Sequence, residues 1–219
     1  MSTDSTAFEK LGRAGIAAVL VLEHEEDALP VAEALLAGGI TAMELTLRTP
    51  AALGALRRIT KALPQMLAGI GTIIKPDQVT QALDCGAAFG VAPGMSPRVV
   101  EKAIASGLPF APGICTPSDI ERALEYDCRL LKFFPAELCG GLKYLEAIAA
   151  PYAHLGLKYI PLGGVSALNC KEWLHSRLVS GIGGSWLAPQ EIIAAKNWDG
   201  ITDRAAHATE LLRSCRPHS

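Results

Sequence analysis

The chain has 219 residues, of which 50% are hydrophobic, 19% are charged and only 5% are aromatic. Its formal net charge of -2 and its scattered basic residues argue against nucleic acid or an anionic membrane as the partner, so we expect a small molecule instead. The first residues lack the pattern of a signal peptide, and no stretch approaches the ~18 uninterrupted apolar residues of a membrane span. We therefore expect a cytoplasmic protein.

A short apolar run, a turn and an Ala/Leu-rich amphipathic stretch recur along the chain, which is typical of alternating strands and helices. Residues 1–15 predict a short leading helix, and residues 201–215 predict the last outer helix. Eight strands are predicted between them, at residues 16–22, 42–47, 66–70, 89–92, 109–112, 130–134, 159–162 and 179–182.

Helix boundaries are also marked in the sequence. Capping residues or first-turn prolines precede apolar periodic runs at residues 75–78, 96–97, 116–119 and 166–169, and Gly38, Gly86 and Gly107 follow others. Eight such units in 219 residues favour one domain, residues 1–219, folded as a single (β/α)8 TIM barrel with a short N-terminal helix. An open doubly wound sheet fits less well, because it would usually carry a GxGxxG turn after its first strand.

The second predicted strand has a polar face. Glu44, Thr46 and Arg48 alternate with apolar residues, so they share one side of the strand. Polar residues that point into a barrel near the carboxyl ends of its strands are where such enzymes place their chemistry. The alternative is an internal Glu44–Arg48 ion pair that only satisfies itself.

A lysine, Lys132, interrupts the apolar sixth strand, residues 130–134. Desolvation disfavours the ammonium form of a buried lysine and favours a neutral amine that can attack a carbonyl. The alternative is a buried stem whose ammonium group reaches solvent. Lys158 sits at the amino end of its strand, and Lys75 and Lys143 fall in turns or helix starts, so these three are weaker candidates.

Two glycine-rich turns follow the seventh and eighth strands, at residues 163–166 and 181–185. In many barrels these two loops bind phosphate, because glycine lets backbone N–H groups approach the oxygens. Plain tight turns are the alternative.

Six cysteines lie far apart without a CxxC pair or clustered histidines. We expect no metal site, and we expect the cysteines to be reduced and mostly buried.

Together these segments resemble the 2-keto-3-deoxy-6-phosphogluconate (KDPG) aldolase family, whose members are also called 4-hydroxy-2-oxoglutarate aldolases. The resemblance runs from about residue 16 to residue 186 and is looser beyond. Its motifs are residues 44–49 (ELTLRT), 69–72 (GIGT), 92–94 (APG), 112–114 (PGI), 132–137 (KFFPAE), 163–166 (GGVS) and 183–186 (GGSW). The resemblance implies a homotrimeric barrel that needs no metal or other cofactor. It also implies reversible cleavage of a phosphorylated keto acid to pyruvate and glyceraldehyde 3-phosphate, or of 4-hydroxy-2-oxoglutarate to pyruvate and glyoxylate.

The same resemblance implies a role for each matching residue. Lys132 would form the Schiff base and Glu44 would be the general acid/base, Arg48 and Thr72 would hold the pyruvate carboxylate, Pro93 and Phe134 would shape the pocket, and Gly163, Gly164 and Ser185 would bind phosphate. Phe134 could instead be core packing, and Glu137 could cap the next helix as readily as take part in the chemistry.

Two positions depart from the family pattern. Leu162 stands where many members carry threonine, which removes a hydroxyl that could contact substrate. The first strand lacks the Pro-Val-Ile sequence that is common in the family, and we expect this difference to affect packing only. Two other functions stay open at this point: another phosphate-binding barrel enzyme in which Lys132 acts only electrostatically, and a non-catalytic sugar-phosphate binding protein.

Overall fold

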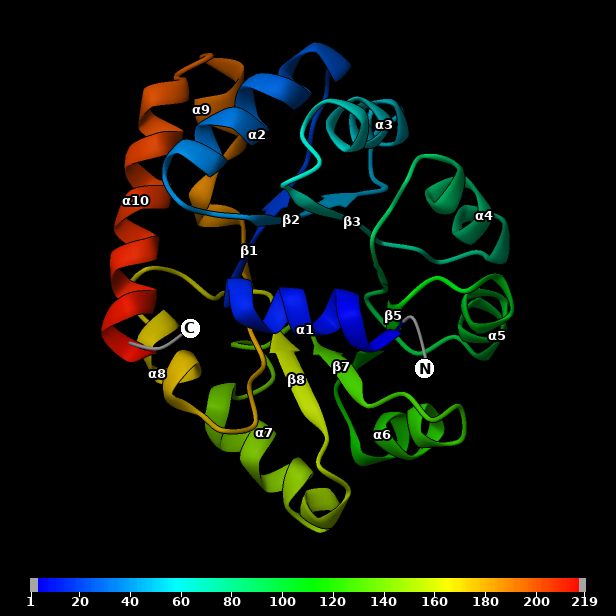
Figure 1. The fold of residues 1–219 in the computed structure, drawn as a ribbon. Coiled ribbons are helices and arrows are strands. Elements are labelled where there is room, and N and C mark those ends of the chain that lie inside the picture. The colour runs from blue at the N-terminus through cyan, green and yellow to red at the C-terminus, as the bar shows by residue number, and fades with distance from the viewer. Residues whose placement is uncertain (1–3, 217–219) are drawn as a thin grey trace.

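The computed structural model describes residues 4–216. Strands gather at the centre, helices surround them, and α1 lies across one end of the strands (Figure 1). The α-helices are α1 (Asp4–Ala14), α2 (Ala28–Ala37), α3 (Ala52–Ala62), α4 (Pro76–Asp84), α5 (Pro97–Ser106), α6 (Pro117–Leu124), α7 (Gly141–Ala149), α8 (Cys170–His175), α9 (Gln190–Ala194) and α10 (Trp198–Cys215), with short 3-10 segments at Glu25–Asp27, Ala150–Leu155 and Ser185–Leu187. The strands are β1 (Ile16–Leu20), β2 (Ala42–Thr46), β3 (Leu67–Gly71), β4 (Gly90–Val91), β5 (Phe110–Ala111), β6 (Gly113–Ile114), β7 (Leu130–Phe133), β8 (Lys158–Pro161) and β9 (Ile182–Gly184).

All the strand pairings are parallel, which confirms the predicted α/β class with a curled parallel sheet. One sheet has the order β5-β4-β3-β2-β1-β9, and a second has the order β6-β7-β8. Glu44 on β2 is in register with Val19 and Gly69, and Lys132 on β7 is in register with Gly113 and Ile160. Since parallel strands end at the same edge, residues that follow different strands meet there.

Two predicted strands differ in detail. The strand predicted at residues 109–112 is divided into β5 and β6, which only Pro112 separates, because proline has no N–H to donate to a ladder. The strand predicted at residues 179–182 starts as a single bridge between Val179 and Tyr159, and β9 then pairs with β1. The region predicted as the eighth strand therefore contacts both β8 and β1.

The predicted helix starts are confirmed where proline marks them. The helices α4, α5 and α6 each begin at such a proline. Thr116 and Asp119 form a reciprocal capping box at the start of α6, in which each side chain accepts from the other residue's backbone N–H. Helix α5 ends at Ser106 and is capped by Gly107, whose φ of 72° is left-handed. Helix α10 begins at Trp198, three residues earlier than residue 201.

The interior has an apolar floor near the amino ends of the strands. Leu11 of α1 packs there with side chains on or directly before several strands, among them Phe89, Leu130 and Ile160. A larger apolar core lies between the strands and the surrounding helices. Among residues 6–216, the buried side chains of Glu44 and Lys132 border this floor. Between residues 4 and 216, no helix combines the length and the apolar character needed to cross a membrane.

All six cysteines are free, but the prediction that most are buried is wrong. Cys85 and Cys170 are buried and the other four are half-buried. Cys115 and Cys139 follow adjacent strands, and their Sγ atoms lie 2.9 Å apart. This contact, together with burial, raises the pKa of Cys115 to about 11.

Candidate active site

A lysine and a glutamate meet in the interior, where most side chains are apolar. Lys132 Nζ donates to Glu44 Oε1 at 2.9 Å, and the two side chains are only 7% and 5% exposed. A buried ion pair is maintained only when each charge compensates the desolvation of the other. Direct contact also allows the carboxylate to take a proton from the ammonium group and leave a neutral amine.

This arrangement corrects one detail of the sequence interpretation. Glu44 pairs with Lys132, which is 88 residues away, and not with Arg48. Thr46, the third residue of the polar face, donates its hydroxyl proton to the carbonyl of Leu20 and so links β2 to β1. Thr46 is therefore a structural residue of this face, although it also borders the cavity described next.

A cavity of about 200 Å³ opens above the Lys132–Glu44 pair at the carboxyl ends of the strands. Its lining includes all nine residues that were predicted to be catalytic or substrate-binding: Glu44, Arg48, Thr72, Pro93, Lys132, Phe134, Gly163, Gly164 and Ser185. These residues come from loops and strands throughout the chain, and the structure brings every one of them together. Their individual roles remain predictions.

Arg48 and Thr72 lie toward the mouth, where β2 and β3 end. Arg48 is exposed, and Thr72 is half-buried with a φ of 61°. A left-handed backbone at a β-branched residue costs roughly 1–3 kcal/mol, and such strain is concentrated at functional sites. The strained turn holds Thr72 at the cavity wall.

Phe134 is not core packing. Its side chain is exposed at the end of β7, and Lys132 Nζ lies 5.7 Å from the centre of its ring. The ring also stands beside Gly163, where a Cβ would come within 3.1 Å of it. Phe134 therefore forms the wall between the lysine and the first glycine turn.

The two glycine turns border the same side of the cavity. Gly163 and Gly164 have left-handed φ values of 92° and 86°, and Ser185 is exposed just after β9. Gly183 and Gly184 also line the cavity. Small residues on both turns leave backbone groups accessible to a ligand.

Glu137 neither caps a helix nor lines this cavity. Helix α7 begins at Gly141 with Gly140 as its cap, and Glu137 Oε1 accepts a hydrogen bond of 2.8 Å from Trp173 Nε1. Of the two alternatives left open for Glu137, the helix cap is therefore wrong.

The first predicted strand, residues 16–22, also contributes to the cavity wall. Val19 and Val21 both line the cavity. Sequence reasoning missed them because apolar residues in a buried strand carry no sign of which ones face a ligand.

The competing lysines are elsewhere. Lys75, Lys143 and Lys158 are exposed, and Lys158 Nζ donates to the carbonyl of Arg177 at 2.7 Å. Lys132 is the buried lysine of residues 6–216, the part of the chain for which burial is described.

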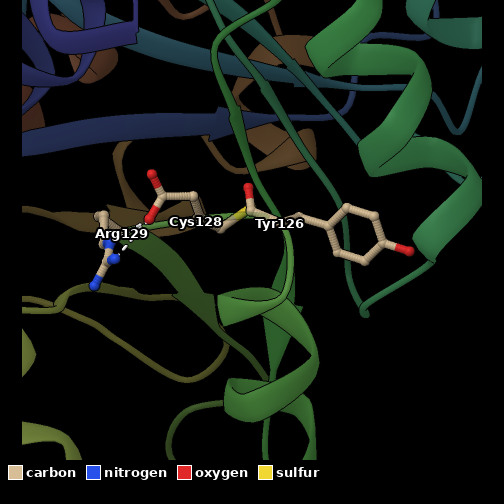
Figure 2. A network of polar contacts seen from close by, with 4 residues as sticks. Tyr126, Cys128 and Arg129 are labelled. Atoms are coloured by element: carbon tan, nitrogen blue, oxygen red, sulfur yellow. Dashed lines mark hydrogen bonds and ion pairs between the residues drawn. The ribbon is translucent and has the colours of Figure 1, made fainter.

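A larger cavity, of about 500 Å³, lies beside α1 and the segment that leads into β7. Figure 2 shows Tyr126, Cys128 and Arg129 on that segment. On this segment, Tyr126 donates to Glu101, and Arg129 forms an ion pair with Asp127. No buried charge faces this space among its described lining residues, so the smaller cavity is the better candidate despite its size.

In residues 4–216 there is no group of three or more His, Cys, Asp and Glu side chains that could hold a metal ion. The site thus offers a buried amine, a carboxylate in contact with it, and an opening lined by an arginine and glycine turns. These features define a class of α/β protein with a lysine–carboxylate pair at the carboxyl ends of a curled parallel sheet.

Comparison with known proteins assigns the family. The profile of the KDPG and KHG aldolase family matches residues 8–204, so the chain belongs to that family. It is 42% identical to the 2-dehydro-3-deoxy-phosphogluconate aldolase of Treponema pallidum, over 94% of this chain and 98% of the relative. It is 37% identical to the KHG/KDPG aldolase of Escherichia coli, over 96% and 98%.

Solved structures agree with this assignment. The KDPG aldolase of Legionella pneumophila, captured with pyruvate as a covalent carbinolamine, superposes with a TM-score of 0.87 at 35% identity, covering 94% of this chain and 97% of that one. The enzyme of Zymomonas mobilis, solved with 3-phosphoglycerate, gives a TM-score of 0.85 at 34% identity and 95% coverage of both chains. The resemblance read from the sequence is confirmed.

Proposed function

We propose that this chain is a class I aldolase, a lyase that cleaves KDPG to pyruvate and glyceraldehyde 3-phosphate through a Schiff base on Lys132. The observation that carries the proposal is the buried 2.9 Å contact between Lys132 Nζ and Glu44 Oε1 beneath an open cavity. The covalent carbinolamine of pyruvate in the Legionella pneumophila relative supports the same chemistry. The smaller 4-hydroxy-2-oxoglutarate is proposed as a second substrate, giving pyruvate and glyoxylate.

The first steps use the lysine–glutamate pair. Glu44 accepts a proton from the ammonium group, and the neutral amine of Lys132 attacks the C2 ketone to form a carbinolamine. Glu44 then returns a proton to the C2 hydroxyl, which leaves as water. The resulting protonated imine accepts electrons from the neighbouring carbon–carbon bond.

Cleavage follows from that imine. Removal of the C4 hydroxyl proton by Glu44, directly or through a water, lets the C3–C4 bond break toward the imine and releases the aldehyde. The enamine that remains takes a proton at C3, and water hydrolyses the imine to release pyruvate and restore Lys132. This route requires no cofactor beyond the lysine itself.

The rest of the cavity would orient the two ends of the substrate. Arg48 offers a planar, permanently charged partner for the C1 carboxylate, with Thr72 beside it. Gly163, Gly164 and Ser185 would bind the phosphate, and the 3-phosphoglycerate found in the Zymomonas mobilis relative supports a site for a phosphorylated acid. Binding energy from the remote phosphate would then hold the C3–C4 bond over the imine.

The deciding experiment is reductive trapping. Incubation with pyruvate and borohydride should convert the imine to a stable secondary amine on Lys132, which also blocks tryptic cleavage at that residue. A Lys132→Met variant should lose the adduct, whereas a matched Lys158→Met variant should keep it. An adduct confined to Lys75, Lys143 or Lys158 would defeat the assignment.

A coupled assay for pyruvate release from KDPG separates a working aldolase from the two other functions. Trapping without turnover would indicate a binding protein that kept the lysine. Turnover of a phosphorylated sugar without trapping would indicate a different barrel enzyme in which Lys132 is only electrostatic.

We also propose that residues 1–219 form one domain whose sheets close into an eight-stranded barrel. Two contacts between the sheets support closure: Gly113 N donates to Gly94 O, and Val179 bridges to Tyr159.

A homotrimeric assembly and a cytoplasmic location remain predictions. Sedimentation of the purified protein tests the first, and fractionation of the producing cells tests the second.

A further inference from the structure

The segment after β7 runs beside the glycine turn after β8. Ala136 N donates to Leu162 O at 2.7 Å, and Glu137 N donates to Gly163 O at 3.0 Å. The parallel pairing of β7 and β8 is thus continued up to the point where the backbone turns through Gly163 and Gly164. The position of the turn therefore depends on the position of Glu137.

Glu137 also occupies the space beside Gly164. A Cβ at Gly164 would come within 2.6 Å of Glu137 Cβ and 2.7 Å of Glu137 Cγ. The stem of the glutamate is therefore in close contact with the backbone of the turn. It supports the turn from the β7 side.

Trp173 fixes the carboxylate of Glu137. The indole nitrogen, Nε1, donates to Glu137 Oε1 at 2.8 Å, and Trp173 is fully buried on α8 with its ring 6.2 Å from that of Phe133. A buried indole N–H without a partner would be costly, so each group holds the other in place. Asn169 Nδ2 also donates to Gly164 O, at 3.1 Å.

We propose that Glu137 is a positioning residue for the phosphate end of the substrate, acting with Trp173 through the backbone of Gly163 and Gly164. The proposal rests on the proposed aldolase function and on these glycines receiving the phosphate. The indole hydrogen bond also holds a negative charge in a fixed place beside an anion site. Without it, the carboxylate is free to approach and repel a phosphate.

The test compares three variants on two substrates. Glu137→Ala removes the stem and the acceptor, Trp173→Phe removes only the donor, and Glu137→Gln keeps both the size and a carbonyl that accepts from the indole. The KM for KDPG should rise about tenfold or more for Glu137→Ala and Trp173→Phe, the effect of losing one charge-assisted hydrogen bond. Glu137→Gln should stay within about threefold of the wild type.

The phosphate-free substrate provides the internal reference. The KM for 4-hydroxy-2-oxoglutarate should change less than about twofold in all three variants, since the imine chemistry is untouched. Inhibition by inorganic phosphate should weaken in parallel with the KM for KDPG. Glu146→Ala, which removes an exposed glutamate of α7, is the matched control and should leave all these values unchanged.

Each outcome is decisive. Equal losses on both substrates, or an unchanged KM for KDPG in folded Glu137→Ala, would overturn the positioning role. If Trp173→Phe fails to fold, Glu137→Ala and Glu137→Gln still decide, because Glu137 is only half-buried. Wild-type protein that neither forms a borohydride adduct with pyruvate nor cleaves KDPG would instead refute the proposed function itself.

Discussion

A methyl group added at Gly71 would overlap the carboxylate of Glu44 before any other group. Gly71 is the last residue of β3, and the three atoms nearest to an added Cβ all belong to Glu44. The backbone of Gly71 lies outside the left-handed region, so Gly71→Ala introduces no strain there. The substitution is therefore a way to displace the proposed acid/base without changing it.

The size of the effect follows from the geometry. Non-bonded carbon and oxygen atoms rarely approach within about 3 Å, so the carboxylate has to retreat by about 1 Å or more. The 2.9 Å contact with Lys132 Nζ would then be lost or badly oriented. A misplacement of about 1 Å in a catalytic group can reduce turnover by about 10². We therefore expect Gly71→Ala to lower kcat for KDPG by about 10².

The assay couples pyruvate release to NADH oxidation by lactate dehydrogenase, with thermal unfolding measured in parallel. Gly94→Ala is the matched control, because a Cβ at Gly94 meets nothing within 4 Å. Glu44→Gln alone should lower turnover by about 10² to 10⁴. Adding Gly71→Ala to Glu44→Gln should cost little more, since both changes act on one group.

Two results would refute this reasoning. Near wild-type turnover in a folded Gly71→Ala protein would mean that Glu44 tolerates displacement and is not the acid/base. Fully additive losses in the double variant would mean that the methyl group acts on something other than Glu44.

Three further predictions concern the phosphate turn, the substituted threonine position and a buried tyrosine. Ser185→Asp places a negative charge against the phosphate, so kcat/KM should fall more than about tenfold further on KDPG than on 4-hydroxy-2-oxoglutarate, and equal losses would remove Ser185 from the phosphate site. Leu162 is buried at the cavity wall, and its side chain cannot hydrogen-bond a substrate hydroxyl. Leu162→Thr should therefore change the kcat/KM ratio of the two C4 epimers by up to about tenfold. An unchanged ratio would mean that selectivity between the epimers is set elsewhere. Burial raises the pKa of Tyr159 from 10.0 to about 12, and its hydroxyl has no hydrogen-bond partner within residues 4–216. The folded state therefore keeps a proton that the unfolded state releases, so this part of the stability is present below pH 10 and is lost as pH rises toward 12. Tyr159→Phe should resist alkaline urea unfolding better than the wild type, by up to about 3 kcal/mol, and identical pH profiles would contradict the burial argument.

The strand positions could be predicted because strands covered on both faces are continuous apolar runs. Proline and capping side chains then located the helix starts with similar accuracy. The late start predicted for α10 has a specific cause: Asn197 caps it by accepting from Gly200 N, a signal that the apolar periodicity alone did not include. Pro112 could be read from the sequence, but the division of the strand at that residue could not. A missing N–H interrupts a strand only where a neighbouring strand offers a carbonyl to it.

The candidate site residues could be located because each lies on a predicted strand or just after one, and parallel strands bring such positions to one end. The periodicity of apolar residues could not predict which other side chain each of these residues contacts. Glu44 contacts Lys132 across the interior although β2 and β7 belong to different sheets, and no pattern within either strand indicates that contact. Glu137 looked like a helix cap from its neighbours in sequence, yet its partner Trp173 lies 36 residues further along.

The Lys132–Glu44 pair links the stability of the fold to its chemistry. Each member makes the burial of the other tolerable, and removing only one leaves an uncompensated charge that typically costs about 3–5 kcal/mol. Replacing both by apolar residues of similar size is often neutral or stabilising, so the fold does not need the pair. The pair is thus a poor explanation of stability and a good one of reactivity, because a carboxylate in contact with a buried amine is what carbinolamine formation requires. A hydrophobic core alone would have been simpler at these two positions, and the presence of the charges there is itself an argument for the proposed aldolase chemistry.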